Sequence, residues 1–573
     1  MVACVATILG ACHEDSPDNT EPPAKEYLRI AENKETTYKI VNYLTNSKPV
    51  EDFASNLSRR VGATLAVVSE AEAGSTAIYI GTAEQLAGKG GVRSAIPYTG
   101  YEIKIDNGNV YLALATEDIA EEAMDALRAL IVKIETNVYG LDVATVGMKN
   151  VNGITEFVPE FETEKGKLVE LHDSGNNNYQ ALYSDLGKDG AADLAAYETK
   201  LVAEGYKLYS ENTIENNRFA TYHKGDTMIY CSYFFLRQQV RVVYGPKTYM
   251  GVDAPVTSYE KVVTPSVSII GMSDSVLCMV IQLADGSFVV IDGGWNTDKY
   301  CSVTLNSGTA QEYSYSYQRD AEKDMENLYN FLKDNTPGGG KPQVTWMITH
   351  ADPDHITLPT RFFKDYKDKF SLNTIVYNFP NMTNIGLGES AGSTNNPSTF
   401  TAYVEGFINN ANKNFPDVKH FVYHTGQKMY LPGCEIEFLF TASEDYRPNV
   451  MPWCNHTSGA WRFTIEGKTV LITGDTENGL NNLMASSFGD YLKSDVLQVV
   501  HHGSNGATIA FYQKVQPEVC FWPCREESFK YDLRHLGEKS GWGFNKYLRE
   551  TATQHYHGST TTTLLLPSLE VKK

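Results

Sequence analysis

The sequence predicts an α/β protein, and three apolar runs that each end in polar residues are the main reason. Residues 344–349, 470–473 and 496–500 are rich in β-branched and apolar side chains and have the length of buried strands. Histidine, aspartate or glycine follows each run, so chemistry-bearing side chains would gather where the strands end. Hydrophobic residues make up 42% of the chain and charged residues 21%, which indicates a folded protein.

The length of 573 residues exceeds what one hydrophobic core supports, so several domains are expected. Residues 29–155 and 165–255 are predicted to form two smaller α+β domains, and residues 262–573 a larger α/β domain. In the first, Asp106-Asn107-Gly108 is a hairpin signal between two strand-like runs, and apolar spacing predicts a helix over 117–133. In the second, a helix is expected over 191–204. Neither small domain carries a recognisable catalytic motif.

The N-terminus resembles a bacterial lipoprotein signal. Residues 1–11 are apolar and end in Leu-Gly-Ala before Cys12, which would carry the lipid, and residues 12–28 are acidic and proline-rich like a flexible tether. We therefore expect an exported protein of the bacterial cell envelope that contacts the membrane only through the lipid on Cys12. The alternative is a soluble protein with an irregular N-terminus. No apolar run reaches 18 residues, so no membrane-spanning helix is expected.

The densest group of metal-capable side chains directly follows the first apolar run. His350, Asp352, Asp354 and His355 place two imidazoles and two carboxylates within six residues. In a loop at the end of a strand, they could converge on one or two cations, with imidazole suiting zinc, iron or copper and carboxylate adding harder character. The alternative is a solvated turn built from aspartate and proline.

Three later segments extend this pattern along the chain. His456 lies in an Asn-His-Thr-Ser-Gly segment, Asp475 follows the second apolar run, and His501-His502 ends the third. Upstream, residues 274–294 contain two strand-like runs and end in Asp-Gly-Gly. In this order, residues 262–570 resemble the metallo-β-lactamase superfamily. The resemblance implies a four-layer αββα fold and a metal-dependent hydrolase.

Aspartate at position 352 gives the motif the form His-x-Asp-x-Asp-His, where the superfamily more often has a second histidine. With Gly-Asp-x-Glu at 474–477 and His-His-Gly-Ser at 501–504, it resembles the hydrolase domain of ComEC-type competence proteins. We expect two divalent metal ions, with zinc as the first choice and manganese or iron as alternatives, because Asp352 supplies an oxygen ligand.

The same resemblance implies a ligand set for each of the two ions. One ion would be bound by His350, Asp352 and His456, and the other by Asp354, His355 and one of His501 and His502. Asp475 would bridge them. Asp354, Asp475 and His502 are expected to take a direct part in catalysis, in which the metal ions activate a water molecule.

Five further residues are candidates for supporting roles. Asp292 and Thr349 are expected to orient the metal ligands, and Ser504 to hold a substrate oxygen, with cap or turn hydrogen bonds as the alternative for each. One of His555 and His557, in a strand-like segment near the C-terminus, is a candidate to face the site as a transition-state donor or ligand, with a surface histidine as the alternative for each. No serine-nucleophile or P-loop motif offers a competing site.

The charge of the chain bears on its substrate. The net charge is −21, and no basic track of the kind that grips long nucleic acids is evident. The resemblance to the ComEC-type domain implies a phosphodiester substrate, cleaved by a metal-activated water. With this charge, a phosphodiester at a surface fits at least as well as one in nucleic acid. Hydrolysis of another ester, lactone, amide or lactam is one alternative. The other is a surface lipoprotein that binds a glycan or a partner and has a catalytically weak metal domain. The sequence does not indicate the oligomeric state.

Overall fold

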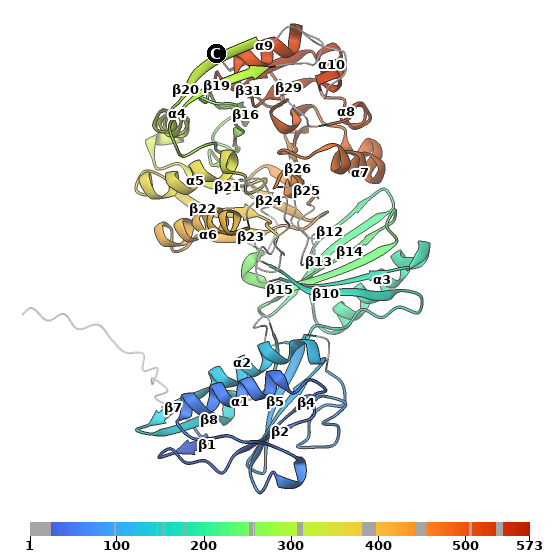
Figure 1. The fold of residues 1–573 in the computed structure, drawn as a ribbon. Helices are drawn as coiled ribbons and strands as arrows, with labels where there is room; N and C mark the ends of the chain where they lie inside the picture. The colour runs from blue at the N-terminus through green and yellow to red at the C-terminus, as the bar shows by residue number, and fades with distance from the viewer. Residues whose placement is uncertain are drawn as a thin grey trace, which may run out of the picture. The chain divides into compact units, whose positions relative to one another are not determined.

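The computed structural model describes residues 25–96, 99–145, 147–151, 154, 156–175, 178–250, 256, 258–305, 313–380, 397–441, 454–503, 507–534 and 542–572. The chain has a mixed α/β structure with several sheets (Figure 1). It divides into two compact units, Met1–Phe157 and Val158–Lys573. Among the helices that the structure describes, none is long and apolar enough to cross a lipid bilayer.

The first unit has a six-stranded mixed sheet, a three-stranded sheet and helices α1 and α2. The predicted hairpin is confirmed: β5 (Gly100–Asp106) pairs with β6 (Asn109–Leu114), and Asn107 and Gly108 have the positive φ angles of a tight turn. Helix α2 (Ala120–Leu130) is shorter than predicted, because the β-branched start of β7 (Ile131–Glu135) pairs with β8. The other elements are β1 (Tyr27–Glu32), β2 (Lys39–Asn42), α1 (Lys48–Val61), β3 (Val67–Val68), β4 (Ala77–Thr82), β8 (Val138–Asp142) and β9 (Met148–Asn150).

The second unit begins with a six-stranded antiparallel sheet in the order β10-β11-β15-β14-β13-β12, accompanied by α3 (Gly190–Ala203) close to the predicted range. Its strands are β10 (Lys167–Gly175), β11 (Asn178–Ser184), β12 (Lys207–Ile214), β13 (Asn217–Lys224), β14 (Thr227–Phe234) and β15 (Gln239–Pro246). Tyr230 is fully buried, stacks on His424 at 4.8 Å and donates its hydroxyl to the Thr425 carbonyl. This sheet therefore packs directly on the rest of the unit.

Two seven-stranded sheets form the remainder of the second unit. The first, in the order β23-β22-β21-β18-β17-β16-β31, consists of β16 (Ser266–Ile269), β17 (Cys278–Gln282), β18 (Phe288–Asp292), β21 (Gln343–Met347), β22 (Ser371–Tyr377), β23 (Lys419–Val422) and β31 (Thr562–Leu565). The second runs β24 to β30 in sequence order and consists of β24 (Lys428–Leu431), β25 (Cys434–Phe440), β26 (Ala460–Ile465), β27 (Lys468–Ile472), β28 (Val496–Gln498), β29 (Val519–Trp522) and β30 (Gln554–His557). A two-stranded sheet, β19 (Lys299–Leu305) with β20 (Tyr313–Arg319), is separate.

Two buried clusters account for how the large sheets pack. Ile291 and Met347 of the first sheet share one cluster with Phe438 and Leu471 of the second. Their sequence neighbours Val290 and Trp346 belong to the other cluster, because successive strand residues point to opposite faces. Helices α4 (Ala321–Asp334), α5 (Pro353–Asp365) and α6 (Pro397–Asn414) contribute to that other cluster. Helices α7 (Asn478–Phe488), α8 (Ile509–Val515) and α10 (Trp542–Thr551) contribute to the first cluster, and α9 is Glu526–Arg534.

The carboxyl ends of the central strands meet where the two sheets approach each other. Strands β18 and β21 are parallel, as are β27 and β28, so each pair ends on one side of its sheet. The Gly459 amide donates to the Thr349 carbonyl at 2.9 Å, and the His501 amide donates to the Gly474 carbonyl at 3.1 Å. A Cβ at Gly474, whose φ is +53°, would lie 2.8 Å from Thr349 Cβ. Glycine at this position therefore lets the ends of β21 and β27 meet.

Candidate metal centre

The histidine-rich motif begins three residues after the end of β21 and runs into the first turn of α5. Asp352 is the N-cap of α5, with an extended backbone (φ −66°, ψ 146°), and Pro353 occupies the start of the helix. The Asp352 side chain makes no capping hydrogen bond, so the helix start is favoured by Pro353, which needs no backbone hydrogen bond in the first turn. The prediction that the whole motif forms a loop is therefore wrong for Asp354 and His355, which lie in the helix. The rings of His350 and His355 are 4.1 Å apart.

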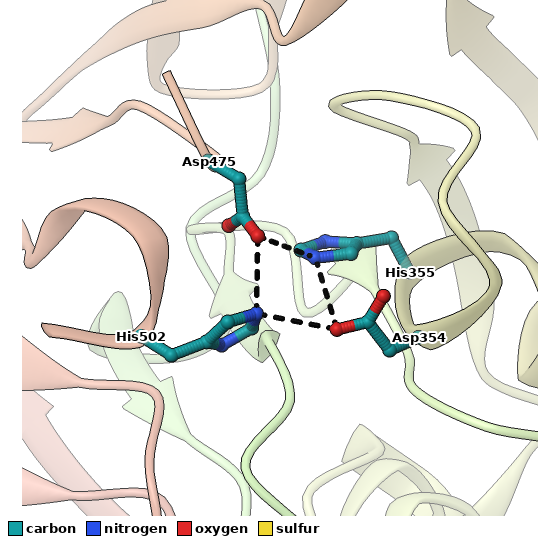
Figure 2. A group of neighbouring side chains, drawn as sticks. All are labelled: Asp354, His355, Asp475 and His502. Carbon is teal, nitrogen blue, oxygen red and sulfur yellow. Dashed lines mark hydrogen bonds and ion pairs between the residues drawn. The ribbon is translucent and has the colours of Figure 1, made fainter. Parts of the chain in front are cut away.

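Asp354, His355, Asp475 and His502 form one group whose ligand atoms all lie within 4.8 Å of one another. His355 Nε2 lies 3.2 Å from Asp475 Oδ2 and 3.6 Å from Asp354 Oδ2. His502 Nε2 lies 3.1 Å from the same Asp475 oxygen and 3.3 Å from Asp354 Oδ2. Figure 2 shows the four side chains pointing toward one another. Two imidazole nitrogens and two carboxylates are a ligand set that suits a divalent cation.

A second group consists of His350, Asp352 and Cys454, whose ligand atoms also lie within 4.8 Å of one another. The sequence analysis missed Cys454, which lies two residues before His456 in the turn Cys454–Thr457. The sequence did contain an indication of this ligand, because Cys454 lies close to the candidate ligand His456 in a segment between two strands. Its burial and the neighbouring Asp352 carboxylate raise the pKa of the Cys454 thiol well above its ordinary value.

Two candidate ligand atoms are among the buried atoms that lack hydrogen-bond partners in the described part of the chain. One is His350 Nε2, which belongs to a fully buried side chain and lies 3.7 Å from Asp352 Oδ2. The other is Asp475 Oδ1. Buried polar atoms are normally paired, since an unpaired one costs about 1–3 kcal/mol. A lone-pair nitrogen and a carboxylate oxygen left in this way fit the binding of a cation.

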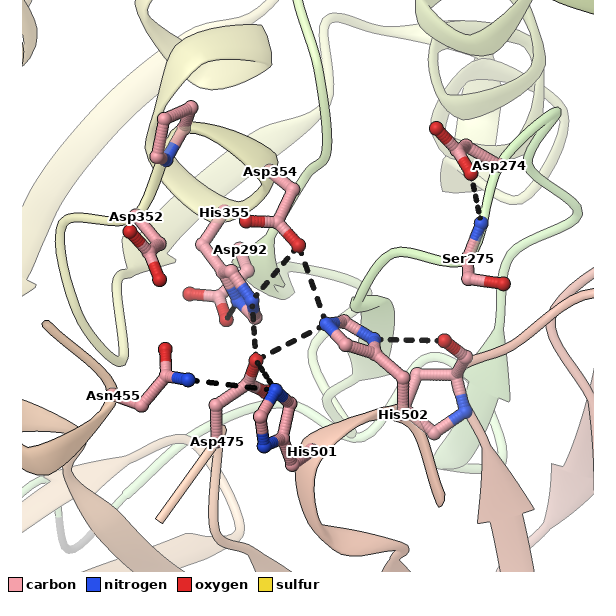
Figure 3. Close-up of polar contacts among 12 residues, drawn as sticks. Asp274, Ser275, Asp292, Asp352, Asp354, His355, Asn455, Asp475, His501 and His502 are labelled. Carbon is pink, nitrogen blue, oxygen red and sulfur yellow. Dashed lines mark hydrogen bonds and ion pairs between the residues drawn. The ribbon is translucent and has the colours of Figure 1, made fainter. Parts of the chain in front are cut away.

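Asp292 connects the hydrogen bonds that orient His350 and His355, and Figure 3 shows its carboxylate beside the His355 ring. This buried carboxylate accepts hydrogen bonds from the Thr349 amide at 2.7 Å, the Thr349 hydroxyl at 2.6 Å and His355 Nδ1 at 2.7 Å. Because a carboxylate only accepts, the Thr349 hydroxyl gives its proton to Asp292 and accepts one from His350 Nδ1, 2.9 Å away. Both rings in their neutral form therefore carry the proton on Nδ1 and keep a lone pair on Nε2.

His502 has the same tautomer for a different reason. Its Nδ1 lies 2.9 Å from the Pro523 carbonyl, which can only accept, so its Nε2 also carries the lone pair when the ring is neutral. Three histidines, His350, His355 and His502, thus have Nε2 as the atom available for a metal.

The His501-His502 pair lies outside β28, in the turn Val500–Gly503. Both residues have left-handed backbones, with φ of 48° and 54°, at a cost of roughly 1–3 kcal/mol each. Strand alternation therefore does not decide between them. His502 belongs to the first group, whereas His501 Nε2 lies 3.8 Å from Asp475 Oδ2 and 3.4 Å from Asn455 Nδ2 (Figure 3).

The charged groups of the site shift one another's pKa values. Burial opposes the charge on Asp475, but His502, His355 and His501 hold the pKa of its carboxyl well below the usual range. Burial also opposes the charge on Asp354, yet the same two neighbours His355 and His502 lower its pKa to about 2. Conversely, burial lowers the pKa of His502, whereas Asp475 and Asp354 raise it to about 10. The carboxylates that favour a proton on these Nε2 atoms would equally favour a cation, so the two compete.

The remaining predicted residues lie elsewhere. His456 Nε2 lies 3.1 Å from Glu477 Oε2, its side chain is 41% exposed, and it belongs to neither group. His555 Nδ1 accepts a hydrogen bond from Trp522 at 3.2 Å, and the His557 ring lies 5.3 Å from that of Phe529. Ser504 and Cys12 are outside the described residues.

Comparison with protein-family models found no match, and comparison with curated proteins found none either. Similar solved structures are metallo-β-lactamase superfamily members at low identity. A point mutant of the CmlA beta-hydroxylase is 11% identical with a TM-score of 0.29, and the match covers 54% of this chain and 55% of that chain. A HARLDQ-motif mutant metallo-beta-lactamase from Cronobacter sakazakii is 13% identical with a TM-score of 0.24, over 50% and 94% of the two chains. A long form RNase Z from yeast is 9% identical with a TM-score of 0.28, over 54% and 49%.

This chain therefore spans about half the length of the CmlA protein. At such TM-scores the similarities carry no functional argument, so the proposed function rests on the side chains of the site.

Proposed function

We propose that the protein is a metal-dependent hydrolase that uses a metal-activated water to cleave a phosphodiester, in nucleic acid or at a surface. The observation that carries this proposal is the convergence of His350, His355 and His502, each with Nε2 as its available atom, on the carboxylates of Asp352, Asp354 and Asp475. Such an arrangement costs stability unless a cation joins it, because buried charges and orphaned polar atoms are unfavourable.

Asp354, His355, Asp475 and His502 would hold one divalent ion, and His350 and Asp352 would contribute to a second, with zinc as the expected metal. When bound, two such ions lower the pKa of a water molecule and stabilise negative charge on the attacking and leaving oxygens of a phosphodiester. Asp292 and Thr349 keep the Nε2 atoms of His350 and His355 available by accepting the protons of their Nδ1 atoms, directly or in relay. A charged phosphodiester needs this cationic centre, because the sequence shows no basic track that could neutralise it.

The same proposal extends to the architecture. We place α4 to α6, the two large sheets and α7 to α10 as the four layers of an αββα domain of the ComEC-type over 262–573, with 29–155 and 165–255 as accessory domains. The two buried clusters support this layering, since one contains residues from both sheets and the other lies between the first sheet and α4 to α6.

Turnover of bis-p-nitrophenyl phosphate by protein of measured metal content tests the proposed reaction. We expect turnover with zinc or manganese, and its loss in Asp475→Ala. Asp490→Ala is the matched control, because the Asp490 side chain is 86% exposed and pairs with Lys514. If the protein binds metal but hydrolyses only carboxylic esters, lactones or lactams, that class of compound is the substrate and the phosphodiester is not. Metal without any turnover would favour a surface-binding role instead.

We also propose that Cys12 carries a lipid that anchors the exported protein in the bacterial cell envelope. The sequence Leu-Gly-Ala-Cys supports this, together with the acidic, proline-rich segment that follows it. Detergent-dependent extraction from membranes is expected for the full chain and not for Cys12→Ala. Equal release of both proteins without detergent would contradict the anchor.

A further inference from the structure

We infer that Cys454, and not His456, completes the first metal centre with His350 and Asp352, as a thiolate ligand that makes this centre selective for a soft divalent cation such as zinc. The inference rests on the proposed function, since it names a ligand of the same dinuclear site. It assigns the two centres different chemistry, and its test does not depend on turnover.

The position of the Cys454 thiol supports this assignment. Cys454 is 1% exposed and is a free cysteine, and its sulfur lies within 4.8 Å of ligand atoms of both His350 and Asp352. An independent observation points to a ligand at the same place, because His350 Nε2 is buried and has no hydrogen-bond partner among the described residues. A cation between these three side chains would satisfy it.

The backbone holds this thiol in place from its C-terminal side. The Thr457 hydroxyl donates to the Cys454 carbonyl at 2.7 Å and closes the turn. Two residues further on, the Gly459 amide donates to the carbonyl of Thr349, the neighbour of His350. The turn with Cys454 is thus attached to the end of the strand that carries His350.

The geometry of the turn separates Cys454 from His456. The four residues Cys454–Thr457 form a 3-10 turn, in which successive residues are rotated by about 120°, so residues two apart lie on different faces. Cys454 is buried beside Asp352, whereas His456 is 41% exposed and pairs with Glu477 at 3.1 Å. One turn therefore does not present both side chains to one ion.

Metal binding by Cys454 requires a simple exchange. The S–H bond breaks, its proton leaves to the solvent, and a sulfur–metal bond forms without any change of oxidation state. The first centre then has one nitrogen, one oxygen and one sulfur ligand, whereas the group around Asp475 has nitrogen and oxygen ligands only. Thiolate favours zinc over manganese or magnesium, so the two centres should differ in metal preference.

Cobalt substitution and X-ray absorption test the inference on the full chain. Cobalt bound to a thiolate absorbs in the near-ultraviolet by charge transfer. We expect this band in the wild type, in His456→Gln and in Cys301→Ser. In Cys454→Ser the band should be absent, and the protein should bind one cobalt ion instead of two. Cys301 is the matched control, a buried free cysteine in the separate β19–β20 hairpin. In the unsubstituted zinc protein, X-ray absorption should show a sulfur neighbour at about 2.3 Å beside nitrogen and oxygen at about 2.0–2.2 Å.

The outcomes separate this inference from the proposed function. A cobalt band that persists in Cys454→Ser, or is lost in His456→Gln, overturns the assignment. So does the absence of sulfur around zinc in the wild type, a result that does not depend on whether Cys454→Ser folds. If sulfur binds the zinc but no phosphodiester is cleaved, Cys454 remains a ligand and the proposed reaction is refuted. If a phosphodiester is cleaved but no sulfur binds the zinc, the reaction remains and Cys454 is refuted as a ligand.

Discussion

Replacing Asp292 by asparagine tests whether hydrogen bonds behind the metal ligands prepare the site. One carboxylate oxygen accepts from both the Thr349 hydroxyl and His355 Nδ1, and the other accepts from the Thr349 amide. An asparagine amide has one accepting oxygen and one donating NH2 group. In either orientation of the asparagine amide, its NH2 group therefore faces at least one of the groups that donate to Asp292 in the wild type. His355 can relieve the conflict by moving its proton to Nε2, which removes the lone pair that faces Asp475.

The expected size of this effect follows from the contacts. Hydrogen bonds to a charged partner contribute roughly 1.5–3 kcal/mol each, and Asp292 is fully buried, so solvent does not replace them. Loss of a partner that orients a metal-binding histidine commonly weakens the metal by about 10–100-fold, or about 1.4–2.7 kcal/mol. We expect this loss at the centre that contains His355, with turnover falling by at least the same factor.

Competition between the protein and a coloured chelator measures zinc affinity directly. Asp285→Asn is the matched control, because Asp285 lies in the turn between β17 and β18 and accepts local hydrogen bonds from Ser287, at 3.0 and 2.6 Å. Asp292→Asn protein that folds and binds zinc as tightly as the control would refute the proposed tautomer relay.

Three further predictions concern the hydrogen-bond relay, the close approach of two strand ends, and a buried carboxyl group. Thr349→Val removes the acceptor of His350 Nδ1, so metal analysis should show weaker binding by about 10-fold or more at the first centre; equal affinity would contradict the relay. Gly474→Ala places a Cβ 2.8 Å from Thr349 Cβ at a φ of +53°, and should lower the free energy of unfolding by about 1–3 kcal/mol; an unchanged thermal midpoint would argue against this close approach. Burial raises the pKa of Asp324 to about 6, so the unfolded chain loses this proton first, and the contribution of Asp324 to stability falls by about 3 kcal/mol between roughly pH 4 and pH 6. Asp324→Asn should therefore gain stability relative to the wild type across that window, and a difference that does not vary with pH would exclude the shift.

Local patterns in the sequence predicted the strands that carry the site. The runs that became β21, β27 and β28 are buried and β-branched, a property that depends only on neighbouring residues. The hairpin at Asn107-Gly108 was equally local, because its turn requires positive φ at both residues. The start of α5 inside the metal motif could also have been predicted from Pro353, since the preference of proline for the first turn of a helix is a local effect.

The partners of these residues were not local. Cys454 lies about a hundred residues from His350 in sequence, and its burial beside Asp352 depends on the hydrogen bond from Gly459 to Thr349 between two sheets. The choice between His501 and His502 depended on two left-handed backbone angles that no residue pattern announces in histidine.

By itself the sequence determined an α/β chain with a group of imidazoles and carboxylates at the ends of buried strands, because strand burial and side-chain chemistry are set residue by residue. Only the tertiary structure decided which of those side chains face one another, which nitrogen each ring presents, and that a cysteine stands beside His350 where a histidine was expected. The physical reason is that ligand geometry depends on contacts between two sheets and on buried hydrogen bonds, which join residues far apart in the chain.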